Sequence, residues 1–142
     1  MIEAAYLNVD LELDSETDLS ALADHLGDSV FLLFNDRING IYRLSLETSV
    51  AEEPASPTRD STRDADDCIW DFLALIAQLP PPLRAAWDGC ISRVFDIGIT
   101  AGTHPSMCIQ TVSETTLQAL SAVRGTIRVT VYPAELENTR NT

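Results

Sequence analysis

Residues 113–125 read SETTLQALSAVRG, and residues 15–27 read SETDLSALADHLG. An ungapped alignment of the two stretches, at an offset of 98, keeps Ser, Glu, Thr, Leu, Ala, Leu and Gly in the same places. Each copy follows a segment of alternating apolar residues and precedes a β-rich run, which predicts strand, helix and strand. We therefore expect two βαβ-like copies, near residues 6–34 and 104–132. Together they indicate an α+β fold with a mixed or antiparallel sheet and helices mainly on one face.

The length and composition favour one folded domain spanning residues 1–142. Hydrophobic residues make up 45% of the chain, which is too many for a disordered chain, and they are too evenly spread for a membrane span. The N-terminus has no basic region followed by an apolar block, so we predict neither a signal nor a transit peptide. The three cysteines are widely spaced without a C-x-x-C pair, which favours reduced thiols. These features predict a cytoplasmic protein.

The chain is strongly acidic. It has 22 carboxylates against nine basic residues, all of them arginine, for a net charge of −13. Residues 1–36 contain nine of the acidic residues and no basic one. Such a field repels phosphate backbones and anionic lipids but accelerates the encounter with a cationic partner. We therefore predict no nucleic-acid or membrane partner, and a basic protein as the class of partner.

The N-terminal part of the chain begins with apolar and polar residues in strict alternation over residues 7–14. This pattern predicts a half-buried strand whose outer face carries carboxylates. Ser15 is then expected to cap the first helix, with Asp18 three residues later completing a capping box. Gly27 would end that helix in a left-handed conformation.

A hairpin is expected next. The run SVFLLF at residues 29–34 is continuously apolar, which is typical of a strand covered on both faces. The turn at residues 35–40 joins it to an alternating strand at residues 41–47. The segment 49–64 is rich in Pro, Ser, Thr and charge, and we interpret it as a flexible surface loop.

The second half continues with a helix over about residues 65–79, apolar around most of its circumference, and a short helix at residues 83–87. Alternation over residues 91–99 predicts a strand, and a turn at residues 100–105 would reverse the chain into a second strand, MCIQTV. The second repeat helix and a last strand, TIRVTVY, complete the expected fold.

Catalytic motifs are missing: the sequence has no P-loop, G-x-G-x-x-G, G-x-S-x-G or H-E-x-x-H pattern. His104 and Cys108, with Asp96, offer a nucleophile and a base in principle. His104 falls in a predicted turn and Cys108 at a strand position, which favours packing roles instead. We therefore predict that the protein is not an enzyme and binds no cofactor.

The row Asp10, Glu12, Asp14 and Glu16 also suggests calcium, because hard cations take oxygen ligands. Residues two apart on a strand are about 6–7 Å apart along its axis, so these carboxylates do not converge on one ion. We predict no metal. A solvated face and a contact for a basic partner both remain open as interpretations.

Tryptophan is enriched at the energetic centres of interfaces. Trp70 lies in the central predicted helix beside Asp66, Asp67 and Asp71. Apolar residues at helical spacing are usually core, but a large ring among carboxylates favours partial exposure. Trp70 is therefore a candidate contact residue, and we interpret Trp87 in the same way.

The second half, with CIWDFLALIAQLP, RVFDIGI, TVSETTLQALSAV and TIRVTVYP, resembles a group of small uncharacterised bacterial α+β domains associated with polymorphic-toxin immunity. The resemblance covers roughly residues 65–133 and rests on the pattern of elements. The group has no agreed catalytic motif, so the resemblance implies no functional residue. It implies an immunity-type binding protein.

These observations predict an acidic binding module that neutralises a basic toxin. The predicted partner-binding residues are Asp10, Glu12, Asp14, Asp18, Asp24 and Trp70. The alternative prediction is a small-molecule-binding regulatory domain, with its ligand in a cleft between the two repeats.

Overall fold

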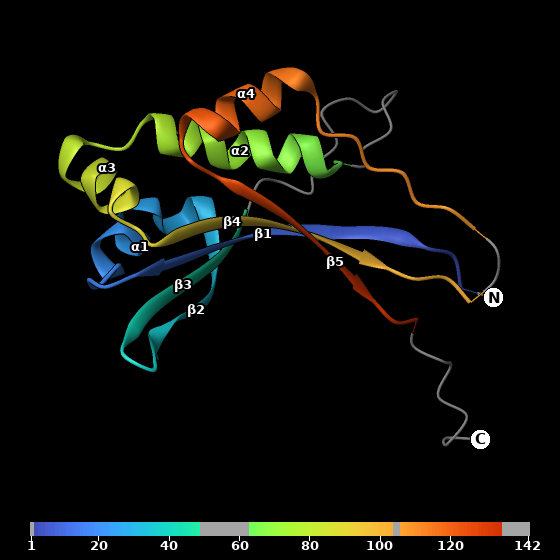
Figure 1. Ribbon diagram of the computed structural model, residues 1–142, viewed down its shortest axis with the longest axis horizontal. Helices are drawn as coiled ribbons and strands as arrows, with labels where there is room; N and C mark the ends of the chain where they lie inside the picture. Colours follow the sequence, from blue (N-terminus) through green and yellow to red (C-terminus); the bar gives the residue numbers. More distant parts are fainter. Residues whose placement is uncertain (1, 49–62, 104–105, 135–142) are drawn as a thin grey trace.

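The computed structural model describes residues 2–48, 63–103 and 106–134 of the chain. Helices and strands form separate layers of one α+β domain (Figure 1). Along the chain the described elements are β1 (Ala5–Ser15), α1 (Ser20–Leu26), a 3₁₀ turn (Gly27–Ser29), β2 (Val30–Ile38), β3 (Ile41–Thr48), α2 (Ala65–Ala77), α3 (Pro81–Asp88), β4 (Ser92–Thr100), α4 (Glu114–Ala122) and β5 (Thr126–Tyr132).

The five strands form one mixed sheet in the order β2-β3-β1-β4-β5. The first strand of the chain, β1, is its centre and pairs antiparallel with both β3 and β4. β2 and β3 form an antiparallel hairpin, whereas β4 and β5 are parallel. Parallel neighbours need a crossover connection, and α4 lies in that connection.

The core lies between one face of the sheet and the helices. Alternation along the strands sends Val9, Leu11 and Leu13 of β1 to this face, together with apolar residues of β3 and β4. Residues from all four described helices belong to the same buried cluster, so these helices cover one face of the sheet. The largest helix residues in it are Leu22, Phe72, Ile76, Trp87 and Leu120. The predicted placement of helices is confirmed.

The helices begin where polar groups satisfy their free N–H groups. Asp64 caps α2 in a capping box: its side chain accepts a hydrogen bond from the Asp67 N–H, and the Asp67 side chain accepts one from the Asp64 N–H. α3 begins with prolines, which suit the first helical turn. Ser113 caps α4 by accepting a hydrogen bond from the Thr116 N–H at 3.2 Å. Residues 49–62, most of the predicted loop, lie outside the described residues.

The structure does not show the predicted pair of βαβ copies as repeats, and it differs from the prediction in two places. Residues 107–112, expected as a strand, form none, so the second unit is built from β4, α4 and β5. In the first unit β1 and β2 are not neighbours, because β3 lies between them. The predicted cap is also wrong: Ser15 is the buried last residue of β1, and α1 begins only at Ser20.

The repeated glycine has a different role in each copy. Gly27 has a φ of +49° with open space around its α-carbon, so the backbone conformation requires glycine there. At Gly125 a side chain would clash, because an added Cβ would lie 2.8 Å from Phe95 and 2.9 Å from Leu120. The left-handed residue after α4 is instead Arg124, with a φ of 62°. The two sequences are similar, but their local structures differ.

The prediction for SVFLLF is wrong. β2 is an edge strand, and most of its side chains are exposed rather than covered. The hairpin after it is confirmed, with a tighter turn than expected at Asn39 and Gly40, which both have positive φ angles. That combination is the type I′ geometry favoured in two-residue hairpins.

Trp87 is a core residue rather than a contact. Its ring is 1% exposed and packs edge-on against Phe95, and its indole N–H donates to the Val123 carbonyl at 3.0 Å. Next to it, the buried Arg93 donates hydrogen bonds to the carbonyls of Trp87, Cys90 and Arg124. These bonds join the end of α3 to the turn before β5.

Candidate functional site

The face of the sheet that none of the described helices covers carries the carboxylates of β1. Asp10, Glu12 and Asp14 point to this face because Val9, Leu11 and Leu13 point to the core. The register places Asp10 opposite Glu47 of β3 on one side and Asp96 of β4 on the other. We call Asp10, Glu12, Asp14, Glu47 and Asp96 the carboxylate face.

Asp10 is the middle of three carboxylates on neighbouring strands. Directly opposite residues have Cβ atoms about 4.5–5.5 Å apart, so like charges there repel. Burial raises the pKa of Asp10 to about 6, and the charges of Glu47, Asp96 and Glu12 add to the increase. The Asn8 amide N–H₂ offsets part of the repulsion between these carboxylates by donating to Asp10 Oδ1 at 3.2 Å and to Glu47 Oε2 at 3.3 Å.

Arg43 neutralises one end of the carboxylate face. Its guanidinium binds both oxygens of Asp14, at 2.8 and 2.9 Å, and lies 3.8 Å from Glu12. These hydrogen bonds hold the pKa of the Asp14 carboxyl below its usual range. This end of the face is therefore organised by an internal ion pair.

Arg128 approaches the face from β5. Its guanidinium lies 3.0 Å from Asp96 and 3.3 Å from Glu12, and the Thr130 hydroxyl donates to Asp96 at 2.7 Å. The five carboxylates thus have two arginines as ion-pair partners. The carboxylate face keeps an excess of negative charge centred near Asp10 and Glu47.

Apolar side chains border this acidic surface. Phe31 lies opposite Glu47, and Phe34 lies opposite Ser45, so both point to the same helix-free side. Their exposed fractions are 57% and 38%. Exposed aromatic rings beside charged groups are the composition of many protein interfaces, which combine an apolar centre with a polar rim.

The six predicted contact residues do not form one surface. Asp10, Glu12 and Asp14 lie together on the carboxylate face, but the other three belong to the helix layer. Asp18 lies in the turn before α1 and accepts hydrogen bonds from the Ser20 N–H and hydroxyl at 2.8 and 2.6 Å. These bonds lower the pKa of Asp18. Asp24 is exposed on α1, and Trp70 is 39% exposed on α2.

Glu47, Asp96 and Arg128 also belong to this surface, and the sequence pattern does not predict them there. The alternation of β3 and β4 shows that Glu47 and Asp96 point away from the core. Only the strand order brings them beside Asp10, and Arg128 joins them because β5 pairs with β4. Strand order cannot be obtained from alternation alone.

Two of the three residues considered for catalysis, Cys108 and Asp96, are described, and they lie on different sides of the sheet. His104 lies outside the described residues. Cys108 lies in the segment between β4 and α4, where Gln110 and Ser113 bond to the start of α2 on the helix side. Asp96 points to the opposite face of the sheet, where Arg128 and Thr130 bind it.

The other two cysteines are held as thiols. Burial raises the pKa of the Cys90 thiol to about 11 and also raises that of Cys68, which accepts a hydrogen bond from the Tyr6 hydroxyl at 3.1 Å. No three His, Cys, Asp or Glu side chains in the described part of the chain are grouped so as to hold a metal ion.

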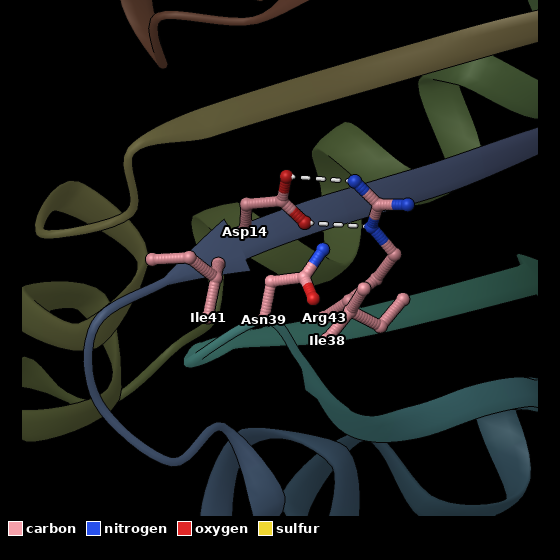
Figure 2. Close-up of a pocket in the computed structure, with 5 residues that line it drawn as sticks. All are labelled: Asp14, Ile38, Asn39, Ile41 and Arg43. Atoms are coloured by element: carbon pink, nitrogen blue, oxygen red, sulfur yellow. Dashed lines mark hydrogen bonds and ion pairs between the residues drawn. The ribbon is translucent and has the colours of Figure 1, made fainter.

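A small open pocket of about 250 Å³ lies beside the β2–β3 hairpin. Figure 2 shows Asp14 and Arg43 facing each other across it, with Ile38, Asn39 and Ile41 around them. The two charged groups of the pocket bind each other. The pocket is formed by the hairpin and the end of β1.

Comparison with known proteins finds no matching family model, no matching curated protein and no matching solved structure. Among the described residues, no helix is both long and apolar enough to cross a membrane.

Proposed function

We propose that this chain is a non-enzymatic protein-binding module whose carboxylate face binds a basic protein. The observation that carries the proposal is the alignment of Asp10, Glu47 and Asp96 across three strands, on a face without a described helix. Like charges so placed repel each other in the free protein. Cationic groups of a partner would relieve that repulsion, and this relief favours binding.

The apolar border supports the same function. Phe31 and Phe34 expose their rings on the helix-free side, next to Glu47 and Ser45. Aromatic anchors supply contact area, while the neighbouring carboxylates accelerate encounter with a basic partner and select against acidic ones. The proposed partner therefore has a basic surface with an apolar site beside it.

We further propose a basic toxin as this partner, which would make the chain an immunity protein. The resemblance of residues 65–133 to immunity-associated domains favours this form of the function. The binding site itself rests on β1, β3 and β4 and does not depend on the resemblance.

The test measures binding of the full chain to the product of the adjacent gene by titration calorimetry. A double variant, Asp10→Asn with Glu47→Gln, removes two charges from the carboxylate face while keeping side-chain shape. The matched control, Glu16→Gln with Asp24→Asn, removes two exposed charges elsewhere, so both variants change the net charge of −13 equally. We expect the first variant to weaken binding at least about tenfold. We expect the control variant to change binding by less than about threefold.

Equal effects of the two variants would mean that net charge, and not this face, attracts the partner. A thermal-shift screen addresses the alternative function. Stabilisation by a small metabolite in the absence of protein partners would support a regulatory domain instead.

A further inference from the structure

The outer edge of β2 is unpaired among the described strands. β2 is nine residues long and lies at one end of the sheet, with β3 on its only paired side. Five large apolar side chains of this strand have exposed fractions between 38% and 58%: Phe31, Leu32, Leu33, Phe34 and Ile38. We call these five residues the β2 edge patch.

Edge strands in soluble proteins are usually short or protected by lysine, proline or inward-pointing charge. β2 has no lysine and no proline. It does have a bulge between Leu32 and Phe34. Phe31 and Phe34 point to the helix-free side, whereas Leu32, opposite Leu46, points to the helix side. A strand with apolar side chains on both faces is typical of the interior of a sheet. β2 therefore has the sequence of an internal strand but lies at an edge.

The size of the β2 edge patch fits a dimer contact. The five side chains, which lie on both faces of the strand, expose on the order of 400 Å² together, comparable to the largest apolar patch of a typical monomer. A standard interface takes about 800 Å² from each partner. Backbone and neighbouring side chains of the hairpin would supply the remaining area.

The neutral charge of β2 favours a second copy of this chain as the partner that binds the β2 edge patch. β2 contains one acidic and one basic residue, Asp36 and Arg37, so the strand is neutral in a chain with a net charge of −13. Two copies can meet here without strong local repulsion. A basic partner would instead be attracted to the carboxylate face.

We propose that β2 pairs antiparallel with β2 of a second copy and forms a homodimer with one continuous sheet. Closed twofold symmetry is the commonest form of such association. With the twofold axis perpendicular to the sheet, both carboxylate faces lie on the same side. Five strand spacings separate the two copies of β1, which places them about 24 Å apart. The dimer does not require the basic partner, although Phe31 and Phe34 belong to both proposed contacts.

The test is the mass of the full chain in solution, measured by light scattering and sedimentation velocity at about 1–100 µM. A dimer has twice the chain mass of 15.5 kDa. Leu33→Lys places a charge in the β2 edge patch, and we expect it to weaken dimerisation at least a hundredfold. The control Val131→Lys changes an exposed residue of the opposite edge strand, β5, and leaves the dimer intact.

Circular dichroism checks that both variants fold. The wild-type measurement alone decides the case if a variant does not fold. A wild-type monomer over the whole concentration range would overturn the proposal. A dimer that Val131→Lys breaks and Leu33→Lys leaves intact would also overturn it, because the interface would then lie at β5.

Discussion

At the scale of single residues, Asp10 lies between two other carboxylates and is half-buried. Its pKa in the folded protein, about 6, is above the ordinary value of 3.8. The folded state therefore holds the proton more tightly than the unfolded state does. The ionised side chain destabilises the fold above about pH 6, and this cost disappears below pH 3.8.

We predict that Asp10→Asn stabilises the protein near neutral pH. The size of the pKa shift corresponds to more than 2 kcal/mol for a fully buried group, and solvent screening reduces this to about 1 kcal/mol here. Urea unfolding at about pH 7.5 should show the gain, and the difference should vanish near pH 4. Asp24→Asn, at an exposed position of α1, is the control for removing one charge. A gain that persists unchanged at pH 4 would contradict the electrostatic explanation.

At the scale of elements, the helices that follow the two similar stretches, residues 15–27 and 113–125, begin at different positions relative to the shared serine. Ser113 caps α4, but Ser15 stays in β1, opposite Tyr42 of β3. Pairing with β3 extends β1 to Ser15, the first residue of the repeated stretch, and α1 begins only five residues later. The segment before Ser113 has no strand partner, and its serine is free to act as the cap.

We predict that Ser113→Ala destabilises the protein by about 1 kcal/mol, because the Thr116 N–H loses its acceptor. The control is Ser121→Ala, an exposed position near the other end of α4, where alanine changes stability by less than about 0.5 kcal/mol. Urea unfolding at fixed protein concentration measures both. Equal losses in the two variants would mean that Ser113 does not act as a cap.

The strands could be predicted from the sequence better than their arrangement. Alternation identified β1, β3 and β4, because one face of each is buried and the other is not. β5 was identified by its β-rich composition, although none of its residues is fully buried. The order of the strands depends on which edges meet, and residue type records this only weakly. β2 was misinterpreted for the same reason: its composition is that of an internal strand. Three of the five residues of the carboxylate face followed from β1, while Glu47 and Asp96 required the strand order.

At the scale of the whole molecule, the excess of 22 carboxylates over nine arginines makes the folded state repel itself. The ion pairs of Arg43 and Arg128 offset only part of this repulsion. Added salt screens unpaired charges, and it weakens the exposed ion pairs less than it relieves the general repulsion.

We predict that raising NaCl from about 0.05 to about 0.5 M stabilises the protein by about 1 kcal/mol, because the screening length falls from roughly 14 to about 4 Å. Unfolding by urea, which is uncharged, measures the change. A variant with Glu3→Gln, Glu16→Gln and Asp24→Asn removes three exposed charges and should respond less to salt. A loss of stability with added salt would show that ion pairs outweigh the repulsion.

The central position of β1 also affects how the chain is made. Ala5–Ser15 leaves the ribosome before both of its partner strands, and β3, its partner on one side, ends at Thr48. Its partner on the other side, β4, is complete only at Thr100. At about 5–20 residues per second, the edge of β1 that pairs with β4 stays unpaired for roughly 3–10 seconds after β3 is complete. The nascent chain therefore exposes two unpaired strand edges, one on β1 and one on β2, before its sheet can close.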